Sequence, residues 1–469
     1  MIEQSQSIYY ISYAVIVAAL VITYLRLKTS EGTVITTKEF QVFQSGFLSG
    51  YSMVILCELI AAASFYHTFI SLHLTLEKIT MLYITTITAS TLAGVVTEIV
   101  DVGTRKDKCV ISAMLYSISM FSILFGGHYE MILLGRIVYG VASSLHHTSF
   151  ESYAVHEHSS LGFPEDWLSH TFSLLTHCMA LMAALSGILG QIAASTGQLG
   201  CPALCCALFA VSAAYMVITW EKDLNSPRFM LSSFIYNMNS TISTMRSNRQ
   251  ILLLLSISSL CEASMLVFTF YWAPWMSALA SEEDERISYE VLFSCLIMAS
   301  MLGNYFFQLF SSSALGGLGY GGTFQAVLLC SSVSYFLGAV FQTPMLAFLI
   351  SLVVHGCMGG YYPAVGFFRG KLMVPELRST ALIILRVSSL LLAVLLLATI
   401  HHNPMYLLGA CSLLNGVAAY LQNNYVSESS SSHPSIYLST SSMCSEMSMT
   451  VITNYGTCPS LSQLRWTML

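Results

Sequence analysis

Residues 43–66 read FQSGFLSGYSMVILCELIAAASFY, and this stretch decides the fold class. It exceeds the length of about 20 apolar residues that a helix needs to cross the hydrocarbon core of a bilayer. Its only charged residue is Glu58. The stretch therefore predicts a transmembrane helix, and the rest of the chain shows that this helix is one of many.

The composition supports an integral membrane protein. Of the 469 residues, 55% are hydrophobic and only 9% are charged, whereas a soluble domain carries about 25% charged residues. So few charges cannot cover a water-facing surface, so most of the surface must face lipid. The net charge is −6 and no broad basic surface is present, which argues against nucleic acid as a partner.

The 13 cysteines do not suggest a metal site or a cofactor. Most of them are scattered through apolar runs, where a thiol behaves as a small hydrophobic group. Cys201, Cys205 and Cys206 are clustered, but no histidine flanks them at the spacing of a zinc site. We therefore expect no metal site and no cofactor.

Further apolar segments of spanning length are distributed along the chain. We interpret them as one amino-terminal helix followed by two groups of six. Glycines and single charges within them are tolerated inside a helical bundle. The segments are 8–25, 43–66, 76–98, 108–125, 129–153, 168–195, 200–220, 250–275, 288–310, 321–341, 344–367, 379–400 and 404–421.

The longest interior polar stretch separates the two groups and reads as a linker with some amphipathic helix. The Ser-rich end of the chain cannot bury enough apolar area to offset its ordering entropy, so it is predicted to be disordered. The predicted organisation is an amino-terminal helix and loop (1–42), a first six-helix bundle (43–220), a cytoplasmic linker (221–249), a second six-helix bundle (250–421) and a disordered tail (422–469).

The distribution of Lys and Arg predicts the orientation. If both ends of each six-helix group lie in the cytoplasm, nearly all basic residues between the spans lie inside, and only Lys78 and Arg286 lie outside. This places the amino terminus outside. Arg26 and Lys28 follow the first segment and no basic residue precedes it, so 8–25 is predicted to be an uncleaved helix and not a signal peptide. We expect a monomer in the plasma membrane.

Charged residues at membrane depth are the candidates for function, because each costs about 2.5–3.5 kcal/mol on insertion scales. Several charges lie at the ends of the predicted spans, and the candidates at membrane depth are few: Glu58, Arg136, Glu151, Glu262 and Arg386.

Arg136 is the leading candidate for binding an anion. It lies in Gly135-Arg-Ile-Val-Tyr-Gly140, and residues four apart share a helix face. Gly140 would let a neighbouring helix or a ligand approach the guanidinium closely. The alternative is an arginine that pairs with a carboxylate and holds two helices together. Arg386 is the second candidate, although it lies near the cytoplasmic boundary and could extend its side chain to the interface.

The three carboxylates are candidates for proton coupling. Burial favours the protonated form of a carboxyl group, which suits Glu58 or Glu262 to loading and releasing a proton. The alternative is a carboxylate held in an ion pair with one of the two arginines. Glu151 lies in Phe150-Glu-Ser-Tyr-Ala-Val-His-Glu-His158, where a gate or a helix-end network is favoured over a metal site.

The loop between the third and fourth predicted spans carries an acid followed by a basic pair. Asp101 precedes Arg105 and Lys106 by four and five residues, so an ion pair across a tight turn is possible. Positive-inside flanking charge would explain the two basic residues but not the acid.

Two groups of six helices, a central linker and this loop together resemble the major facilitator superfamily. Asp101, Arg105 and Lys106 match its loop signature, but Thr104 stands where glycine is expected. Arg136 and Gly140 match the Arg-x-x-x-Gly of its fourth core helix. The Gly-Pro signature of its drug/proton antiporters is absent from the fifth core helix, 168–195.

Within the superfamily the chain resembles the molybdate-anion transporter family, from about residue 40 to 420. The matching residues come in the same order along the chain, and the family also has an acid where Glu58 stands. They are Phe150-Glu151, His156-Glu157-His158, Phe163-Pro164, Trp167, Glu262, Trp272-x-Pro274, Tyr361-Tyr362-Pro363, Phe368-Arg369-x-Lys371, Pro375-Glu376 and Arg386-Val387.

The resemblance implies uptake of molybdate, a tetrahedral dianion. Entry against a negative-inside potential costs about 2.3 kcal/mol per charge per 100 mV, so we expect co-transported cations, with protons as candidates. Arginine suits an oxyanion because its planar fork is always charged. Tyr361 and Tyr362 could add hydrogen bonds to the oxo groups, or could be ordinary packing residues.

Two other functions stay open. One is transport of another small solute or organic anion, although Arg136 and Arg386 speak against a neutral sugar. The other is a membrane receptor or sensor that keeps a transporter fold. We do not expect an enzyme, because the sequence has no nucleotide-binding loop, no metal cluster and no nucleophile–base pair.

The predicted topology can be tested at Asn239. Asn239-Ser240-Thr241 matches an acceptor for N-linked glycosylation, but it lies in the linker that we place in the cytoplasm. Glycosidase treatment should therefore leave the mass of the protein unchanged. A glycosidase-sensitive shift that disappears in Asn239→Gln would mean that the topology is inverted.

Overall fold

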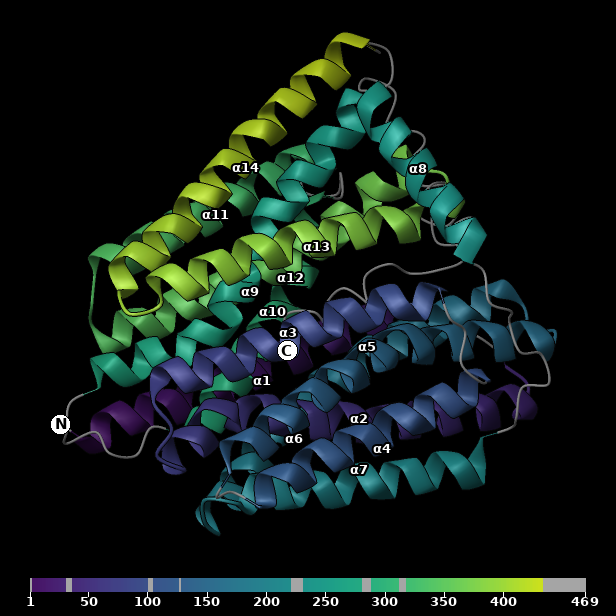
Figure 1. The fold of residues 1–469 in the computed structure, drawn as a ribbon. Coiled ribbons are helices and arrows are strands. Elements are labelled where there is room, and N and C mark those ends of the chain that lie inside the picture. Colours follow the sequence, from purple (N-terminus) through teal and green to yellow (C-terminus); the bar gives the residue numbers. More distant parts are fainter. Residues whose placement is uncertain are drawn as a thin grey trace. The chain divides into compact units, whose positions relative to one another are not determined.

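The computed structural model describes residues 2–30, 36–99, 104–125, 128–220, 231–280, 288–311 and 318–432. Within these residues the chain forms helices and no strand, which confirms the predicted all-α class (Figure 1). The helices are α1 Ile2–Ser30, α2 Lys38–Ser71, α3 Leu76–Ile99, α4 Arg105–Leu124, α5 Tyr129–Ser160, α6 Glu165–Ser195, α7 Gly200–Thr219, α8 Leu231–Ser247, α9 Arg249–Leu279, α10 Tyr289–Ser311, α11 Gly319–Val340, α12 Pro344–Leu372, α13 Pro375–Ile400 and α14 Pro404–Ser432.

Eleven of the described helices are long and apolar enough to cross a membrane, which confirms a multi-pass membrane protein. Two predicted spans are not among them. In α1 the described apolar part is Ile8–Thr23, which is shorter than a candidate membrane span. In α5 the polar residues Arg136, His146 and His147 lower the hydropathy of a helix that is otherwise long enough. The least apolar helix of the predicted bundles thus carries the leading functional candidate.

The described helices pack into two compact units. Unit 1 comprises the chain up to Met230 together with Ala280–Met298, and unit 2 comprises Leu231–Leu279 and the chain from Ala299 onwards. The first part of α10 therefore packs in unit 1 and its later part in unit 2, whereas the sequence-based boundaries assign all of α10 to the second bundle. The residue boundaries of the two six-helix bundles stay a prediction.

Aromatic residues join the ends of three helices in unit 1. Trp220 follows α7, stacks on Tyr153 of α5 with ring centroids 4.4 Å apart, and donates its indole N–H to the carbonyl of Gly46 in α2 at 3.2 Å. Gly50 lies so close to the Trp220 ring that a Cβ there would be 2.8 Å from it. The amino-terminal helix also belongs to unit 1, because Tyr13 of α1 donates to the Ala184 carbonyl of α6 at 2.5 Å.

The described part of the loop before α4 explains why threonine replaces the expected glycine. Thr104 is the N-cap of α4: its hydroxyl accepts from the backbone N–H of Asp107, whose carboxylate accepts from the backbone N–H of Thr104. Arg105 donates to the Ser152 hydroxyl of α5 at 3.1 Å, and Lys106 donates to the carbonyls of Val217 and Trp220 at the end of α7. Asp101 lies outside the described residues.

In unit 2, the backbones of α10 and α12 approach each other closely at two glycines. A Cβ on Gly303 would lie 1.8 Å from the carbonyl oxygen of Gly356, and one on Gly359 would lie 1.8 Å from the carbonyl oxygen of Ser300. Small residues are typical of such interfaces in membranes, since packing there depends on close approach.

The predicted linker and tail both contain helix. Between the two groups of spans, α8 packs against α9 and α13 with Thr241 buried and Asn239 exposed. At the carboxyl end, α14 runs to Ser432, past the predicted boundary at 421. Buried Gln422 and Tyr425 explain this extension, because Tyr425 packs on Phe368 with ring centroids 5.4 Å apart. Residues 433–469 lie outside the described residues.

The packing of α3 on α5 can be tested at Gly140. A Cβ there would lie 2.5 Å from the Thr86 carbonyl oxygen and 2.9 Å from the Ser90 backbone nitrogen. Because backbone cannot rotate away, Gly140→Ala should destabilise the protein by about 1–3 kcal/mol, measured as a lower Tm in detergent. Gly409→Ala in α14 is the control, since nothing lies within 4 Å of its Cβ position, and its Tm should not fall. An unchanged Tm in Gly140→Ala would contradict the described packing.

Candidate functional site

Arg136 of α5 lies buried between aromatic rings, with an exposed fraction of 3%. Its Nε donates to the hydroxyl of Thr86 in α3 at 2.9 Å. The guanidinium carbon lies 4.7 Å from the ring centroid of Phe65 in α2 and 4.2 Å from that of Tyr139 in α5. Ring faces stabilise a cation electrostatically, more strongly where water is excluded. The two rings can therefore stabilise the positive charge of Arg136 without a carboxylate partner.

No ion pair between Arg136 and a carboxylate is present in the described part of the chain. The structural alternative, an arginine that pairs with an acid to join two helices, is therefore not what these residues show. Gly140 allows a neighbouring helix to approach, because its Cβ position is filled by the α3 backbone at Thr86 and Ser90. In this conformation the glycine accommodates a helix and not a ligand.

Glu58 of α2 is fully buried and binds groups other than arginine. Its Oε1 accepts a hydrogen bond from the hydroxyl of Tyr116 in α4 at 2.8 Å. Its Oε2 lies 3.6 Å from Nε2 of His146 in α5. At this distance the two atoms make no hydrogen bond, and each lacks a hydrogen-bond partner among the described residues.

His146 is a residue that the sequence reasoning missed. It is 0% exposed, and it shares α5 with Arg136. The signal was present in the sequence, since His146 and His147 are consecutive in a predicted span. An imidazole is neutral near physiological pH, so His146 does not stand out among the Asp, Glu, Lys and Arg residues of the predicted spans.

Two tyrosines connect the buried acid to the buried arginine. The rings of Tyr116 and Tyr139 lie edge to face with centroids 4.8 Å apart. Tyr116 binds Glu58, and Tyr139 contacts the guanidinium of Arg136. We call these five residues, Glu58, Tyr116, His146, Tyr139 and Arg136, the unit 1 cluster. Although α2, α4 and α5 contribute one or more residues each, the cluster is continuous through ring contacts and hydrogen bonds.

Glu151 lies further along α5 and is only partly buried. The next residue, Ser152, accepts the hydrogen bond from Arg105 at the start of α4. The structure therefore places Glu151 beside a contact between helix ends, outside the unit 1 cluster.

In unit 2, Glu262 of α9 is partly buried and also binds a tyrosine. The hydroxyl of Tyr361 in α12 donates to Oε1 of Glu262 at 3.1 Å and approaches the Ser258 carbonyl at 3.5 Å. Tyr361 is 0% exposed, and its ring lies against that of Tyr362 with centroids 5.2 Å apart. Arg386 of α13, partly buried, interacts electrostatically with Glu262. Three of the predicted binding residues are thus close to one carboxylate.

Arg369 is the second residue that the sequence reasoning missed. It is 5% exposed near the end of α12, and its charge also interacts with Glu262. The sequence offered two signals for it: the residue belongs to a stretch shared with the molybdate-anion transporters, and it lies close to Tyr361 and Tyr362. It was assigned instead to the positive charge that flanks cytoplasmic helix ends.

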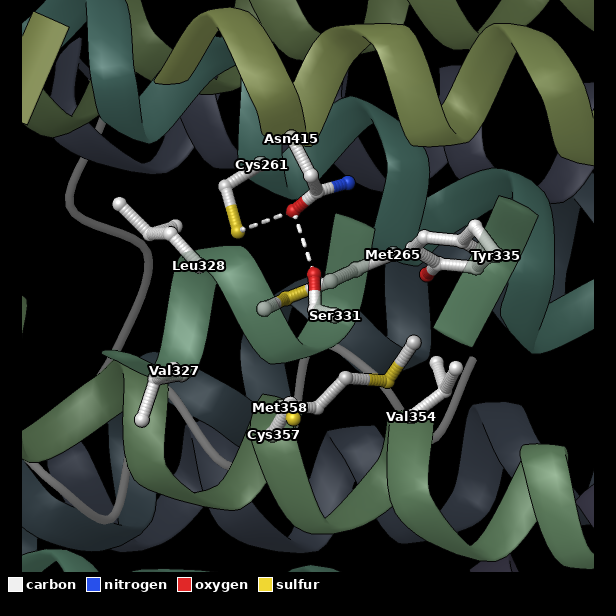
Figure 2. A pocket seen from close by; sticks show the side chains of 10 residues that line it. All are labelled: Cys261, Met265, Val327, Leu328, Ser331, Tyr335, Val354, Cys357, Met358 and Asn415. Atoms are coloured by element: carbon white, nitrogen blue, oxygen red, sulfur yellow. Dashed lines mark hydrogen bonds between the residues drawn. The ribbon is translucent and has the colours of Figure 1, made fainter. Parts of the chain in front are cut away.

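The pocket in Figure 2 is too small for an oxyanion. It encloses about 10 Å³ between α9, α11, α12 and α14, which is room for about one water molecule. Asn415 organises its polar side by accepting from Ser331 at 2.8 Å and from the Cys261 thiol at 3.4 Å and by donating to Ser264 at 2.7 Å. This network satisfies buried polar groups and does not form a substrate site.

Comparison with known proteins supports the resemblance seen in the sequence. A family described as sugar transporters with 12 transmembrane segments matches residues 8–359. A curated molybdate-anion transporter of Danio rerio is 26% identical, over 84% of this chain and 86% of its own length. One of Xenopus laevis is 27% identical, over 78% of this chain and 80% of its own length. The predicted resemblance is therefore confirmed.

Solved transporter structures share the fold. A mutant of the peptide transporter POT superposes with a TM-score of 0.66 at 12% identity, covering 82% of this chain and 93% of its own. The nucleoside transporter NupG superposes with a TM-score of 0.59 at 14% identity, covering 82% of this chain and 98% of its own. At these identities the likeness shows the fold alone, and it confirms the predicted major-facilitator architecture.

Proposed function

This chain belongs to the family of transporters with 12 transmembrane segments that its residues 8–359 match, and we propose that it takes up molybdate by alternating access. The relatives named molybdate-anion transporters align with it over most of both chains. The plasma membrane is the proposed location, and the monomer is the proposed state.

The observation that carries this proposal is the buried guanidinium of Arg136. A cation at membrane depth is costly unless it has a structural partner or a function. Within the described residues Arg136 has no carboxylate partner, and it is held by rings and one hydroxyl. Its charge is therefore not neutralised internally, and a tetrahedral dianion would supply the missing negative charge through the planar fork.

We further propose that uptake is coupled to protons and that Glu58 is the coupling residue. Two negative charges entering against 100 mV cost about 4.6 kcal/mol, so co-transported cations are needed to drive accumulation. Glu58 and Glu262 were both candidates. Protonating Glu262 would weaken its electrostatic interaction with Arg369 and Arg386. Glu58 accepts a hydrogen bond from a tyrosine hydroxyl and lies 3.6 Å from an imidazole, so its protonation would disturb no arginine. His146 then serves as the proton's second acceptor.

A second candidate function follows from the family description. That description concerns sugar transporters, so a neutral solute or an organic anion is the competing substrate. Sugar sites need hydrogen-bond donors and acceptors but no net positive charge. The uncompensated charge of Arg136 favours the anion, and a receptor without transport would be recognised by binding without uptake.

The role of Arg136 can be tested by Arg136→Lys. Lysine keeps the charge but loses the bidentate fork, so the apparent affinity for molybdate in proteoliposome uptake should fall about tenfold or more. Arg246→Lys on exposed α8 is the matched control and should leave affinity unchanged. If Arg136→Lys is as stable as the wild type and transports with unchanged affinity, Arg136 does not bind the substrate.

The role of Glu58 can be tested by Glu58→Gln, which keeps the shape of the side chain and removes the titrating proton. Uptake driven by a pH gradient should be lost and should no longer depend on pH, while molybdate–molybdate exchange across the membrane continues. Glu130→Gln, on the exposed start of α5, should keep the wild-type pH profile. A wild-type pH profile in Glu58→Gln would remove Glu58 from the coupling mechanism.

A further inference from the structure

Arg369 of α12 is a buried guanidinium with unused hydrogen-bond donors. Its Nε makes one long bond, 3.4 Å, to the Val365 carbonyl of its own helix. Its Nη1 and Nη2 are buried and have no hydrogen-bond partner among the described residues. Leaving charged donors unpaired away from water is among the most unfavourable arrangements in a folded protein. An acceptor is therefore missing at this position.

A structural role at the end of α12 does not account for Arg369. The carbonyls at this helix end are bound by another arginine, because Arg378 of α13 donates from Nε to Met373 at 3.1 Å and from Nη2 to Gly370 at 3.0 Å. Arg378 therefore already binds two of the acceptors at this helix terminus. Arg369 and Arg378 both lie near the end of α12, but only Arg378 donates hydrogen bonds to its terminal carbonyls.

The groups around Arg369 fit an oxyanion. Tyr361 and Tyr362 lie about two turns earlier on the same helix, and the charge of Glu262 in α9 interacts with that of Arg369. Arg386 also acts on Glu262. Glu262 thus lies in the electrostatic field of two guanidiniums. The parallel Nη donors of one guanidinium match two oxygens of a tetrahedral anion.

We propose that Arg369, with its unpaired Nη1 and Nη2 groups, forms an oxyanion-binding site in unit 2 between α9 and α12, for a tetrahedral dianion of the molybdate type. Glu262 and Tyr361 are positioning residues of this site: the carboxylate attracts the guanidinium, and the tyrosine hydroxyl holds the carboxylate. The site rests on the proposed function and extends it, because it assigns substrate binding to a residue outside the unit 1 cluster.

Arg369→Lys and Arg378→Lys form a matched pair for the test. Molybdate binding to the purified full-length protein is measured by equilibrium dialysis, and Tm is measured without substrate. Arg369→Lys should lower the affinity for molybdate about tenfold or more at a Tm close to that of the wild type. Arg378→Lys should show the opposite pattern, a lower Tm with unchanged affinity. Unchanged affinity in a folded Arg369→Lys variant overturns this inference and leaves the proposed function standing.

A measurement on the wild type covers the case in which Arg369→Lys does not fold. Arginine side chains are modified with phenylglyoxal, with and without molybdate, and the modified positions are read by mass spectrometry. Molybdate should protect Arg369 and leave the modification of Arg378 unchanged. Equal rates at Arg369 with and without molybdate overturn the site. A wild type that neither binds nor transports molybdate overturns the proposed function and this site together.

Discussion

The arrangement of charge in this protein depends on one constraint: a charge inside a membrane bundle must be stabilised by the protein itself. The simplest solution pairs each arginine with an acid, which neutralises both. In the described residues, Glu58, Glu262 and Arg136 are instead stabilised by contacts with aromatic side chains. Glu58 and Glu262 each bind a tyrosine hydroxyl, while Arg136 lies between aromatic rings. Tyrosine donates a hydrogen bond to a carboxylate without cancelling its charge, which is the property that the proposed proton carrier Glu58 requires.

The two units use this solution in parallel. In each, the carboxylate comes from the first core helix, α2 or α9, and the tyrosine comes from a later helix of the same unit. They differ in what surrounds the acid. Glu58 is fully buried beside an imidazole, whereas Glu262 is partly buried near two guanidiniums. Unit 1 thus holds its acid beside an imidazole, and unit 2 holds its acid near two guanidiniums.

Much of the fold could be predicted from the sequence, because length and apolar content determine which segments span a bilayer. The candidate acids could be found in the same way, since a lone Glu in an apolar run such as 43–66 is conspicuous. Their partners could not. Whether Arg136 meets a carboxylate or a ring depends on how α2, α3 and α5 rotate against one another, and no periodicity in one helix encodes that rotation. Arg369 could not be recognised from the sequence for a related reason. Basic residues at helix ends commonly mark the cytoplasmic side of the membrane, and sequence position alone does not show that Arg369 is buried.

The glycine contacts between α10 and α12 have a mechanical consequence. At Gly303 and Gly359 the two backbones meet with no side chain between them, so no rotamer change can absorb a displacement of one helix against the other. The two helices must therefore move as a single lever. Tyr361 lies two residues beyond Gly359 and Arg369 lies on the same helix, so their positions are tied to that of α10. A shift of α10 would therefore displace the polar groups on α12.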